Sequence, residues 1–448
     1  MPKRQFTALS LFSGGMGLDI GIEQTRRFHL LGCCELVPTF CSTIRANRDA
    51  GRIGGKNLKV YEGDISTLDP AQIMGELGLK PGELDLILGG PPCQSFSTTG
   101  KRATVQDRRG TMLWQFLRFV EVFKPKSFVL ENVRGLMSAA LRHRPIKDRP
   151  DKGGKSLEED EQPGSVIRSF IRDLHDAYRM DCFEVNAVNY GTPQLRERAI
   201  LVGNMFNRLV DFPDPTHGNA NEQSKTASLF DEDVESLTPF KTMGEALKGL
   251  NDPNPVIMDF SPRKKSYLQL VPQGGNWRSL PEAIAKESMG KAYFAKGGRS
   301  GWWRRLSFDL PSPTIVTMPN HSSTALCHPT ETRALSLREC ARIQEFPDDW
   351  IFCGTPLEQY TQVGNAVPVG LAVVVGGVVA KLLDCIYDDG FKLAEGHLEA
   401  CRIVYIKSHI RTRQWFKAGA TYLWQDGEDN NDVKYSPAKT TRKVRRLE

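Results

Sequence analysis

The chain has 448 residues, of which 40% are hydrophobic and 25% are charged, and its formal net charge is +6. This composition indicates a soluble globular protein of two or three domains, and the mild positive charge alone favours nucleic acid only weakly. The ten cysteines include no CxxC pair, which argues against a disulfide framework and against a zinc or other metal site, and favours reduced thiols in the cytoplasm. We expect no secretory signal, and the most apolar run, 367–380, is too short for a membrane span and contains Pro and Gly, so it predicts a buried helix.

The first two hundred residues alternate short apolar runs with amphipathic stretches. This βαβα rhythm predicts a doubly wound, mostly parallel α/β sheet, Rossmann-like, with helices on both faces. The expected strands are 7–12, 29–34, 58–61, 84–88, 127–130, 183–188 and 199–203, and the expected helices are 17–26, 112–123 and 166–178.

The rhythm breaks in two places. Residues 143–164 are rich in charge, Pro and Gly and predict a mobile loop insertion. Residues 204–311 hold much Pro and Gly and three of the seven Trp residues, Trp277, Trp302 and Trp303, which indicates a second, smaller, irregular domain. Two more helices are expected at 336–344 and 364–383. The expected division is therefore 1–203, 204–311, 312–386 as the rest of the first domain, and 387–448 as an appendage with a basic tail.

Residues able to do chemistry follow the expected strands at their carboxyl ends, where ligands bind in a doubly wound sheet. The Gly-rich loop 12–17 would let a ligand approach backbone N–H groups at the start of a helix. Glu35 is placed to accept hydrogen bonds from ribose hydroxyls, and Asp64 could do similar work on an adenine amino group. Ile20 stands where a dinucleotide motif has its third glycine, which argues against NAD.

Cys93 ends a Gly-Gly-Pro-Pro-Cys segment after the fourth expected strand. Most free cysteines are small buried hydrophobes. A reactive thiolate instead needs an exposed, rigid and electropositive setting. The two prolines fix the backbone before Cys93, and we therefore interpret it as a nucleophile.

Three charged residues accompany Cys93. Glu131 follows the fifth strand in the same crevice, where a carboxyl group could protonate or hydrogen-bond a ring nitrogen; the alternative is a solvated acid at a strand end. Arg196 and Arg198 would point to one side of an extended segment and suit a phosphate or a base oxygen. The alternative for them is a surface ion pair with an acid such as Glu197.

This set of residues resembles the DNA (cytosine-5)-methyltransferases of bacterial restriction–modification systems. Any one motif could arise by chance, but the motifs run in the family's order from residue 9 to residue 368. The matching segments are 12–17 (Phe-Ser-Gly-Gly-Met-Gly), 92–97 (Pro-Cys-Gln-Ser-Phe-Ser), 131–133 (Glu-Asn-Val), 194–198 (Gln-Leu-Arg-Glu-Arg), 338–347 (Arg-Glu-Cys-Ala-Arg-Ile-Gln-Glu-Phe-Pro) and 362–368 (Gln-Val-Gly-Asn-Ala-Val-Pro).

The resemblance implies S-adenosyl-L-methionine as cofactor. It also implies that the closing helix returns to the first domain and brings Asn365 beside the cofactor. The cofactor-binding residues that it implies are Phe12, Ser13, Gly14, Gly15, Gly17, Glu35, Asp64, Ile65, Pro92, Asn365 and Val367.

The resemblance implies a covalent mechanism on Cys93, Glu131, Arg196 and Arg198. The Cys93 thiolate attacks C6 of cytosine while Glu131 supports the protonated N3, so C5 becomes nucleophilic and accepts the methyl group. A base removes the C5 proton and the enzyme is eliminated. The target base must be flipped out of the duplex, because its reacting carbon is inaccessible inside the stack.

In such enzymes the segment before the ninth motif reads the DNA sequence, which here is 204–311. Asn276, Arg278, Arg304 and Arg305 lie in two Gly- and Trp-containing clusters and are candidates for base contacts; the alternative is that the tryptophans form this domain's core. Residues beyond about 390 have no motif counterpart. There, basic and aromatic residues interleave and suit phosphate contact, although a merely solvated appendage is the alternative.

The resemblance implies double-stranded DNA as partner, a bacterial or archaeal cytoplasm with association to the nucleoid, and a monomer. A cognate restriction endonuclease would act on the same site without forming a complex. Three rivals stay open: an RNA (tRNA) cytosine-5 methyltransferase, an NAD-dependent oxidoreductase, and a silent DNA-binding protein on the same fold.

Overall fold

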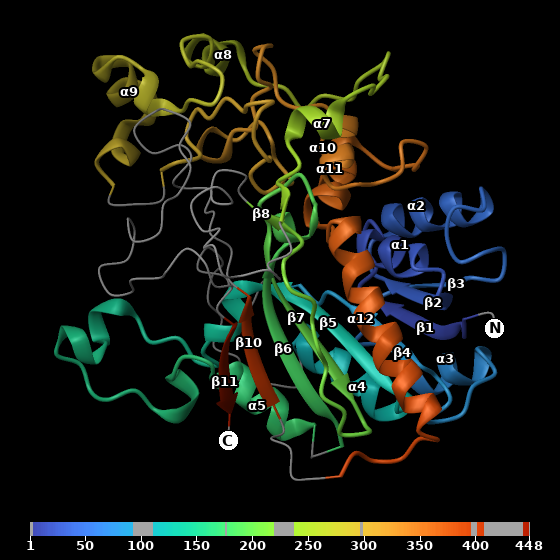
Figure 1. Ribbon diagram of the computed structural model, residues 1–448. Coiled ribbons are helices and arrows are strands. Elements are labelled where there is room, and N and C mark those ends of the chain that lie inside the picture. The colour runs from blue at the N-terminus through green and yellow to red at the C-terminus, as the bar shows by residue number, and fades with distance from the viewer. Residues whose placement is uncertain are drawn as a thin grey trace, which may run out of the picture.

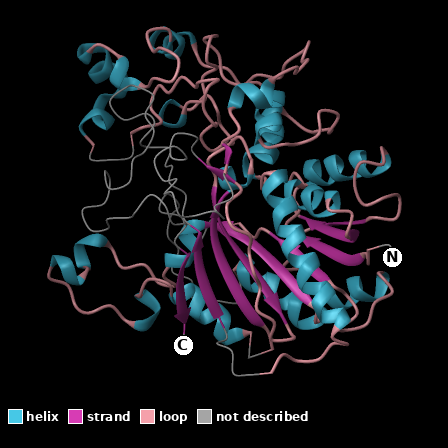
Figure 2. Ribbon diagram, in the orientation of Figure 1, coloured by secondary structure: helices cyan, strands magenta, loops and turns pink. Residues whose placement is uncertain are grey.

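The structure is a computed structural model that describes residues 3–92, 111–174, 177–218, 237–295, 299–395, 401–406 and 442–447. Its centre is a nine-stranded sheet in the order β11-β10-β6-β7-β5-β4-β1-β2-β3 (Figures 1 and 2). The strands are β1 (Phe6–Leu11), β2 (Phe28–Glu35), β3 (Lys59–Glu62), β4 (Leu86–Gly89), β5 (Ser127–Val133), β6 (Arg179–Asn186), β7 (Glu197–Asn204), β10 (Cys401–Ile406) and β11 (Arg442–Leu447), and a separate short pair is β8 (His217–Gly218) with β9 (Thr238–Pro239).

Most strands of the large sheet run in one direction. β3, β2, β1, β4 and β5 pair in parallel, and β10 pairs in parallel with β6. β7 is antiparallel to both of its neighbours, β5 and β6, and β11 is antiparallel to β10. The carboxyl ends of β1 to β6 therefore meet at one edge, and the predicted doubly wound, mostly parallel sheet is confirmed.

Helices cover both faces of the sheet. One core lies under α1 and α12, and α12 crosses the near face of the sheet in Figure 1. The other core lies under α4 and α5. The helices are α1 (Gly17–Gln24), α2 (Pro38–Asp49), α3 (Pro70–Glu76), α4 (Met112–Phe123), α5 (Ser165–Asp173), α7 (Met243–Leu247), α8 (Pro262–Leu268), α9 (Glu282–Met289), α10 (Leu337–Ile343), α11 (Pro356–Asn365) and α12 (Val369–Asp388).

The apolar run near the C-terminus forms α12, as predicted, but the helix expected at 364–383 begins only at Val369, after Pro368, and extends to Asp388. Among the described residues it is the helix whose length and hydropathy would suit a membrane span, but 61% of its most apolar stretch is buried inside the protein. Gly21 on α1 lies so close to it that an added Cβ would stand 2.4 Å from Cβ of Ala372. The helix is therefore a core element packed on α1.

The smaller domain has a hydrophobic core of its own, built around Phe260, Leu268 and Trp303. Trp277 and Trp302 pack against that core, which supports the structural interpretation of the tryptophans. The predicted end of this domain at residue 311 is corrected, because Ala325, Cys327 and Ala334 belong to the same core. Between residue 303 and residue 325 of this core, the chain contacts the first domain at Ser312, which forms an isolated β-bridge with Gln194.

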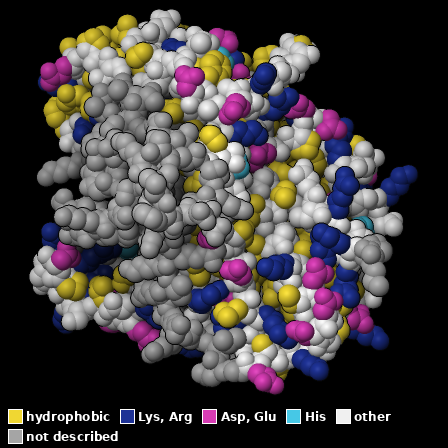
Figure 3. Space-filling model, in the orientation of Figure 1, with side chains coloured by type: hydrophobic (Ala, Val, Ile, Leu, Met, Phe, Trp, Pro, Cys, Tyr) yellow, Lys and Arg dark blue, Asp and Glu magenta, His cyan; other side chains and the backbone are white. Residues whose placement is uncertain are grey.

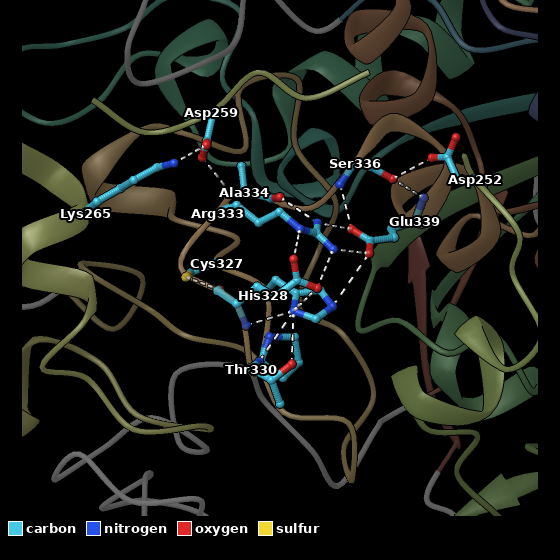
Figure 4. A network of polar contacts seen from close by, with 12 residues as sticks. Asp252, Asp259, Lys265, Cys327, His328, Thr330, Arg333, Ala334, Ser336 and Glu339 are labelled. Atoms are coloured by element: carbon cyan, nitrogen blue, oxygen red, sulfur yellow. Dashed lines mark hydrogen bonds and ion pairs between the residues drawn. The ribbon is translucent and has the colours of Figure 1, made fainter. Parts of the chain in front are cut away.

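A polar network joins the smaller domain to α10 (Figure 4). Arg333 donates to both carboxylate oxygens of Glu339, at 2.8 Å each. His328 faces the same carboxylate, and burial lowers its pKa. Asp259, directly before Phe260 of the smaller domain's core, accepts from the backbone N–H of Ala334 and pairs with Lys265. These contacts fix the smaller domain relative to the motif that α10 carries.

The C-terminal region is more than an appendage, which corrects that part of the predicted division. β10 extends the large sheet by pairing with β6. Arg402 donates to the fully buried Asp181 of β6 at 2.7 Å, and Asp181 also pairs with Arg179. Because a buried carboxylate is costly without partners, these ion pairs anchor β10 to the large sheet.

The insertion after β5 projects from the body at the lower left of Figure 1. It contains three short 3-10 helices, at Ile146–Asp148, Pro150–Lys152 and Glu159–Glu161. Arg142 pairs with Asp160 at 3.0 Å, and Arg144 pairs with Glu161. The insertion is thus a loop, as predicted, and ion pairs hold its parts together; its predicted mobility stays a prediction.

Candidate active site

The Gly-rich loop follows β1 and turns sharply into α1. Phe12, Gly14 and Met16 have positive φ angles of 56°, 53° and 67°, a conformation that non-glycine residues adopt only when surrounding structure holds them there. One such contact is visible: the N–H of Gly14 donates to Oε2 of Glu35 at 2.7 Å. The loop is therefore held in this conformation by a contact within the protein.

The loop packs against the junction of α11 and α12. A Cβ on Gly15 would stand 2.8 Å from the carbonyl oxygen of Gln362, and one on Gly17 would stand 2.2 Å from that of Val367. These positions exclude any side chain. The contacts place the segment with the exposed Asn365 beside the loop, so the first and last motifs meet although about 350 residues of sequence lie between them.

Two acids follow the neighbouring strands β2 and β3, and Glu35 contacts the loop. Glu35 is buried at the end of β2, and burial raises its pKa, against the effect of hydrogen bonds from Val37 and Gly14. Asp64 is exposed after β3 and accepts from the N–H and the hydroxyl of Ser66, which lower its pKa. Leu36, directly after Glu35, is 59% exposed and offers an apolar surface that sequence reasoning missed.

Arg118 of α4 is a second residue that sequence reasoning missed. Its guanidinium donates to the carbonyl oxygens of Ile65 and Leu68, the latter at 2.9 Å. These bonds hold the loop that carries Asp64 and the buried Ile65. Arg118 is partly buried and lies on the side of α4 opposite its apolar stripe, and no local sequence signal singled it out.

Cys93 and residues 94–97 lie outside the described residues, but the segment that leads to them is described. Asn132 donates to the carbonyl oxygen of Pro91 at 3.0 Å. A Cβ on Gly90 would stand 3.0 Å from Oε2 of Glu131. The Gly-Pro-Pro segment thus lies against the Glu-Asn pair of β5, as the order of the strands predicted, and Pro92 is exposed at its end.

Glu131 forms an ion pair with Arg198. Its Oε1 lies 2.5 Å from Nε of Arg198, and each side chain is 11% exposed. The pair is possible because β5 and β7 are antiparallel neighbours in which Glu131 pairs with Ile200, two residues from Arg198. A desolvated carboxylate held by one guanidinium is a fixed hydrogen-bonding group beside the Pro-Pro segment.

Arg196 has a different place from the one expected, and its assignment as a contact to phosphate or base is corrected. Its side chain is fully buried. Nη1 donates to the carbonyl oxygen of Ile315 at 3.1 Å and Nη2 to that of Gly364 at 2.9 Å. Burial lowers its pKa well below the usual value. Arg196 therefore joins β7 to the returning C-terminal segment.

Three of the four candidates for base contacts also serve the interior of the smaller domain, which corrects their assignment. Arg305 is buried and donates to the carbonyl oxygens of Val271 and Leu268, each at 2.7 Å. Arg304 donates to Ala325, and burial lowers its pKa to about 9. Asn276 is buried and donates to Ser300. Irregular backbone leaves carbonyl groups without ladder partners, and these side chains satisfy them.

Arg278, the fourth candidate, is half-buried and lies over the ring of Trp277, with 4.7 Å between Cζ and the ring centroid.

Comparison with known proteins agrees with this geometry. The family model for C-5 cytosine-specific DNA methylases matches residues 6–381. The Type II methyltransferase M.PspPI of Psychrobacter sp. (strain TA137) is 36% identical over 398 residues, which cover 87% of this chain and 83% of that protein. M.Eco47II of Escherichia coli is 36% identical over 388 residues, covering 85% and 80%. The solved structure of a prophage-encoded DNA modification methyltransferase of E. coli matches with a TM-score of 0.54 at 21% identity, over 85% of this chain and all of that one, which shows a shared fold.

Proposed function

Since the chain belongs to the C-5 cytosine-specific DNA methylase family, we propose that Cys93, Glu131 and Arg198 form its catalytic centre. The protein is a DNA (cytosine-5)-methyltransferase that depends on S-adenosyl-L-methionine. The observation that carries the assignment of the centre is the contact of Glu131, held by Arg198, with the segment leading to Cys93.

The chemistry of the loops fits the cofactor. Backbone N–H groups of the Gly-rich loop suit its carboxylate. Glu35 suits the ribose hydroxyls, and the exposed side chain of Leu36 beside it suits the flat adenine. The bound cofactor supplies the electrophilic methyl group. The proposed contacts of Phe12, Asn365 and Val367 follow from their places in the loop and in the segment packed on it.

The target cytosine would bind beside Glu131, which lies against the segment that leads to Cys93. The Cys93 thiolate forms a bond to C6, and N3 takes a proton that Glu131 stabilises, so that the ring electrons become available at C5. After methylation a base removes the proton from C5. The electrons of that bond then re-form the C5–C6 double bond, and the thiolate leaves as 5-methylcytosine is released.

We place the enzyme in a restriction–modification system, because its relatives are Type II methyltransferases. It would act as a cytoplasmic monomer on double-stranded DNA of the nucleoid, and a cognate endonuclease would cut the same unmethylated site without binding the methyltransferase.

Bisulfite sequencing of a plasmid treated with the protein and S-adenosyl-L-methionine tests this function. We expect protected cytosines in one short repeated context. The Cys93→Ala variant should lose protection but keep binding cofactor and DNA. Cys385→Ala is the matched control, because Cys385 is exposed on α12, and it should methylate normally. Turnover by Cys93→Ala would refute the nucleophile, and methylation of tRNA in place of the plasmid would refute the substrate.

A further inference from the structure

The insertion after β5 leaves the body of the protein close to the proposed catalytic centre. Gly164 and Val166 donate their backbone N–H groups to the carbonyl oxygen of Ala139 at 3.1 Å and 3.3 Å, so the two ends of the insertion meet there. Ala139 is the eighth residue after Glu131, and an extended chain spans at most about 3.6 Å per residue. The ends of the insertion therefore lie within roughly 29 Å of Glu131, which is less than one turn of duplex DNA.

Positive and negative charges occupy different parts of the insertion. Residues 142–155 include six Lys or Arg residues and two acids, whereas residues 158–161 are four consecutive acids. Each of these four acids forms an ion pair with one of three arginines, Arg142, Arg144 and Arg172. Because the four acids already have these partners, they do not neutralise the remaining basic residues of 142–155, and that segment keeps an excess of positive charge.

Three lysines of this segment are exposed, and we call residues 147–155 the lysine loop. They are Lys147, Lys152 and Lys155. The ion pairs described within the insertion involve none of the three. Figure 3 shows Lys and Arg side chains on the surface at the lower left of the molecule, where Figure 1 places the insertion. The lysine loop thus presents ammonium groups to the solvent.

The backbone of the lysine loop closes on itself. The N–H of Gly154 donates to the carbonyl oxygen of Arg149 at 3.0 Å, and a Cβ on Gly154 would stand 2.0 Å from the carbonyl oxygen of Asp148. At the end of the loop, Nη1 of Arg144 donates to the carbonyl oxygen of Lys155 at 2.6 Å. These contacts keep the three lysines on one compact turn, so that less conformational freedom is lost when a partner binds them.

The surface of the insertion suits a polyanion better than a protein. Among the side chains that the structure describes, none of the large exposed hydrophobic residues belongs to the insertion. A protein interface usually needs apolar or aromatic anchors at its centre. A nucleic-acid backbone needs only positive charges, because their binding releases the counterions condensed on the phosphates.

On the basis of the function proposed above, we propose that the lysine loop contacts phosphates of the DNA backbone beside the methylation site. Each ammonium group would take the place of a counterion at one phosphate. Contacts to phosphate carry no sequence information, so the loop would add the same affinity to any sequence. The insertion would thus be a second DNA-binding element, supplied by the catalytic domain.

The test measures binding of the full-length protein to two duplexes of equal length, one with and one without the methylation site, at several salt concentrations. In the triple variant Lys147→Gln, Lys152→Gln and Lys155→Gln, we expect both affinities to fall about tenfold and the slope of log affinity against log salt to fall by about two to three. The affinity ratio of the two duplexes should stay the same. KM for DNA should rise while kcat and Tm stay at the wild-type values, and the triple variant with Arg at these positions should keep the slope.

The matched control replaces Lys80, Lys124 and Lys381 with Gln, which removes the same charge. Lys80 and Lys124 are exposed before β4 and β5, at the amino ends of those strands, and Lys381 is exposed on α12; this variant should bind both duplexes as the wild type does. Equal losses in the control and the lysine-loop variant, or an unchanged salt slope in the lysine-loop variant, would overturn the proposal. Wild-type protein that binds neither duplex would instead overturn the proposed function.

Discussion

The guanidinium of Arg196, directly before β7, donates to the carbonyl oxygen of Gly364 at the end of α11, with 2.9 Å between Nη2 and the oxygen. Gly364 itself has no space for a Cβ, which would stand 2.6 Å from the backbone nitrogen of Thr317. The bond thus closes a tight junction of three segments that are distant in sequence. The motifs at 194–198 and 362–368 are therefore joined by a hydrogen bond from a side chain to the backbone.

We predict that Arg196→Met destabilises the protein by about 3 kcal/mol, because it leaves the buried carbonyl groups of Ile315 and Gly364 without donors. Urea unfolding measures the effect. Arg134→Met removes an exposed arginine that pairs with Glu197 and should change stability by less than about 1 kcal/mol. Equal effects of the two substitutions would contradict a structural role for Arg196.

Arg198→Lys should lower kcat about tenfold to a hundredfold while leaving cofactor affinity nearly unchanged. Lysine keeps the charge but cannot hold Glu131 with the fixed geometry of a guanidinium. Single-turnover methylation and cofactor titration separate the two effects. The assignment of Arg198 fails if kcat stays at the wild-type value in a folded variant.

Arg118→Met should weaken S-adenosyl-L-methionine binding about tenfold, since two hydrogen bonds that hold the loop of Asp64 and Ile65 are lost. Calorimetric titration of the cofactor measures this. Arg172→Met is the control, because Arg172 is an exposed arginine on α5 with Glu159 as its partner. If Arg118→Met binds the cofactor as tightly as the control does, Arg118 does not support the cofactor site.

Asp19 predicts a pH dependence of stability. It is fully buried in α1, and burial raises its pKa to about 7; the charges of Glu23 and Glu35 raise it slightly, whereas the hydrogen bond with Ser10 lowers it. The folded state then binds the proton more tightly than the unfolded state, whose pKa is near 3.8, so stability falls as pH rises from about 4 to 7.

The Asp19→Asn variant lacks this titration. Its stability relative to wild type should therefore increase by about 3 kcal/mol between pH 5 and pH 8. Urea unfolding of both proteins across that range measures the difference, and parallel stability curves would contradict a raised pKa for Asp19.

Exchange of the smaller domain with that of a relative should transfer sequence specificity when residues 204–335 are exchanged. Exchange of 204–311 alone should give an unstable protein, because Ala325, Cys327 and Ala334 complete the same hydrophobic core. Thermal unfolding and bisulfite sequencing of both chimeras check this. A stable, active short chimera would restore the boundary predicted from the sequence.

Several elements that the sequence analysis missed had local signals. α2 and α3 both begin with a proline at the first helical turn, and Asp69 caps α3 by accepting from Ala71, which is a recognisable helix start. β10 had no such signal. Its six residues form a strand because β6 offers an open sheet edge and Asp181 offers a buried partner for Arg402.

The sequence by itself determined seven of the nine strands of the large sheet, the order of the motifs and the family, because alternating periodicity and the loops after strands are local features. It placed Glu131 next to the segment before Cys93, since the carboxyl ends of neighbouring strands must meet. Only the tertiary structure showed that the two arginines of this motif have different partners. Arg198 pairs with Glu131, whereas Arg196 donates to a buried backbone carbonyl group. It likewise showed that Arg304 and Arg305 are buried in the smaller domain. A charged side chain looks the same in sequence whether it meets DNA or a buried carbonyl group, and the difference depends on which distant segments fold around it.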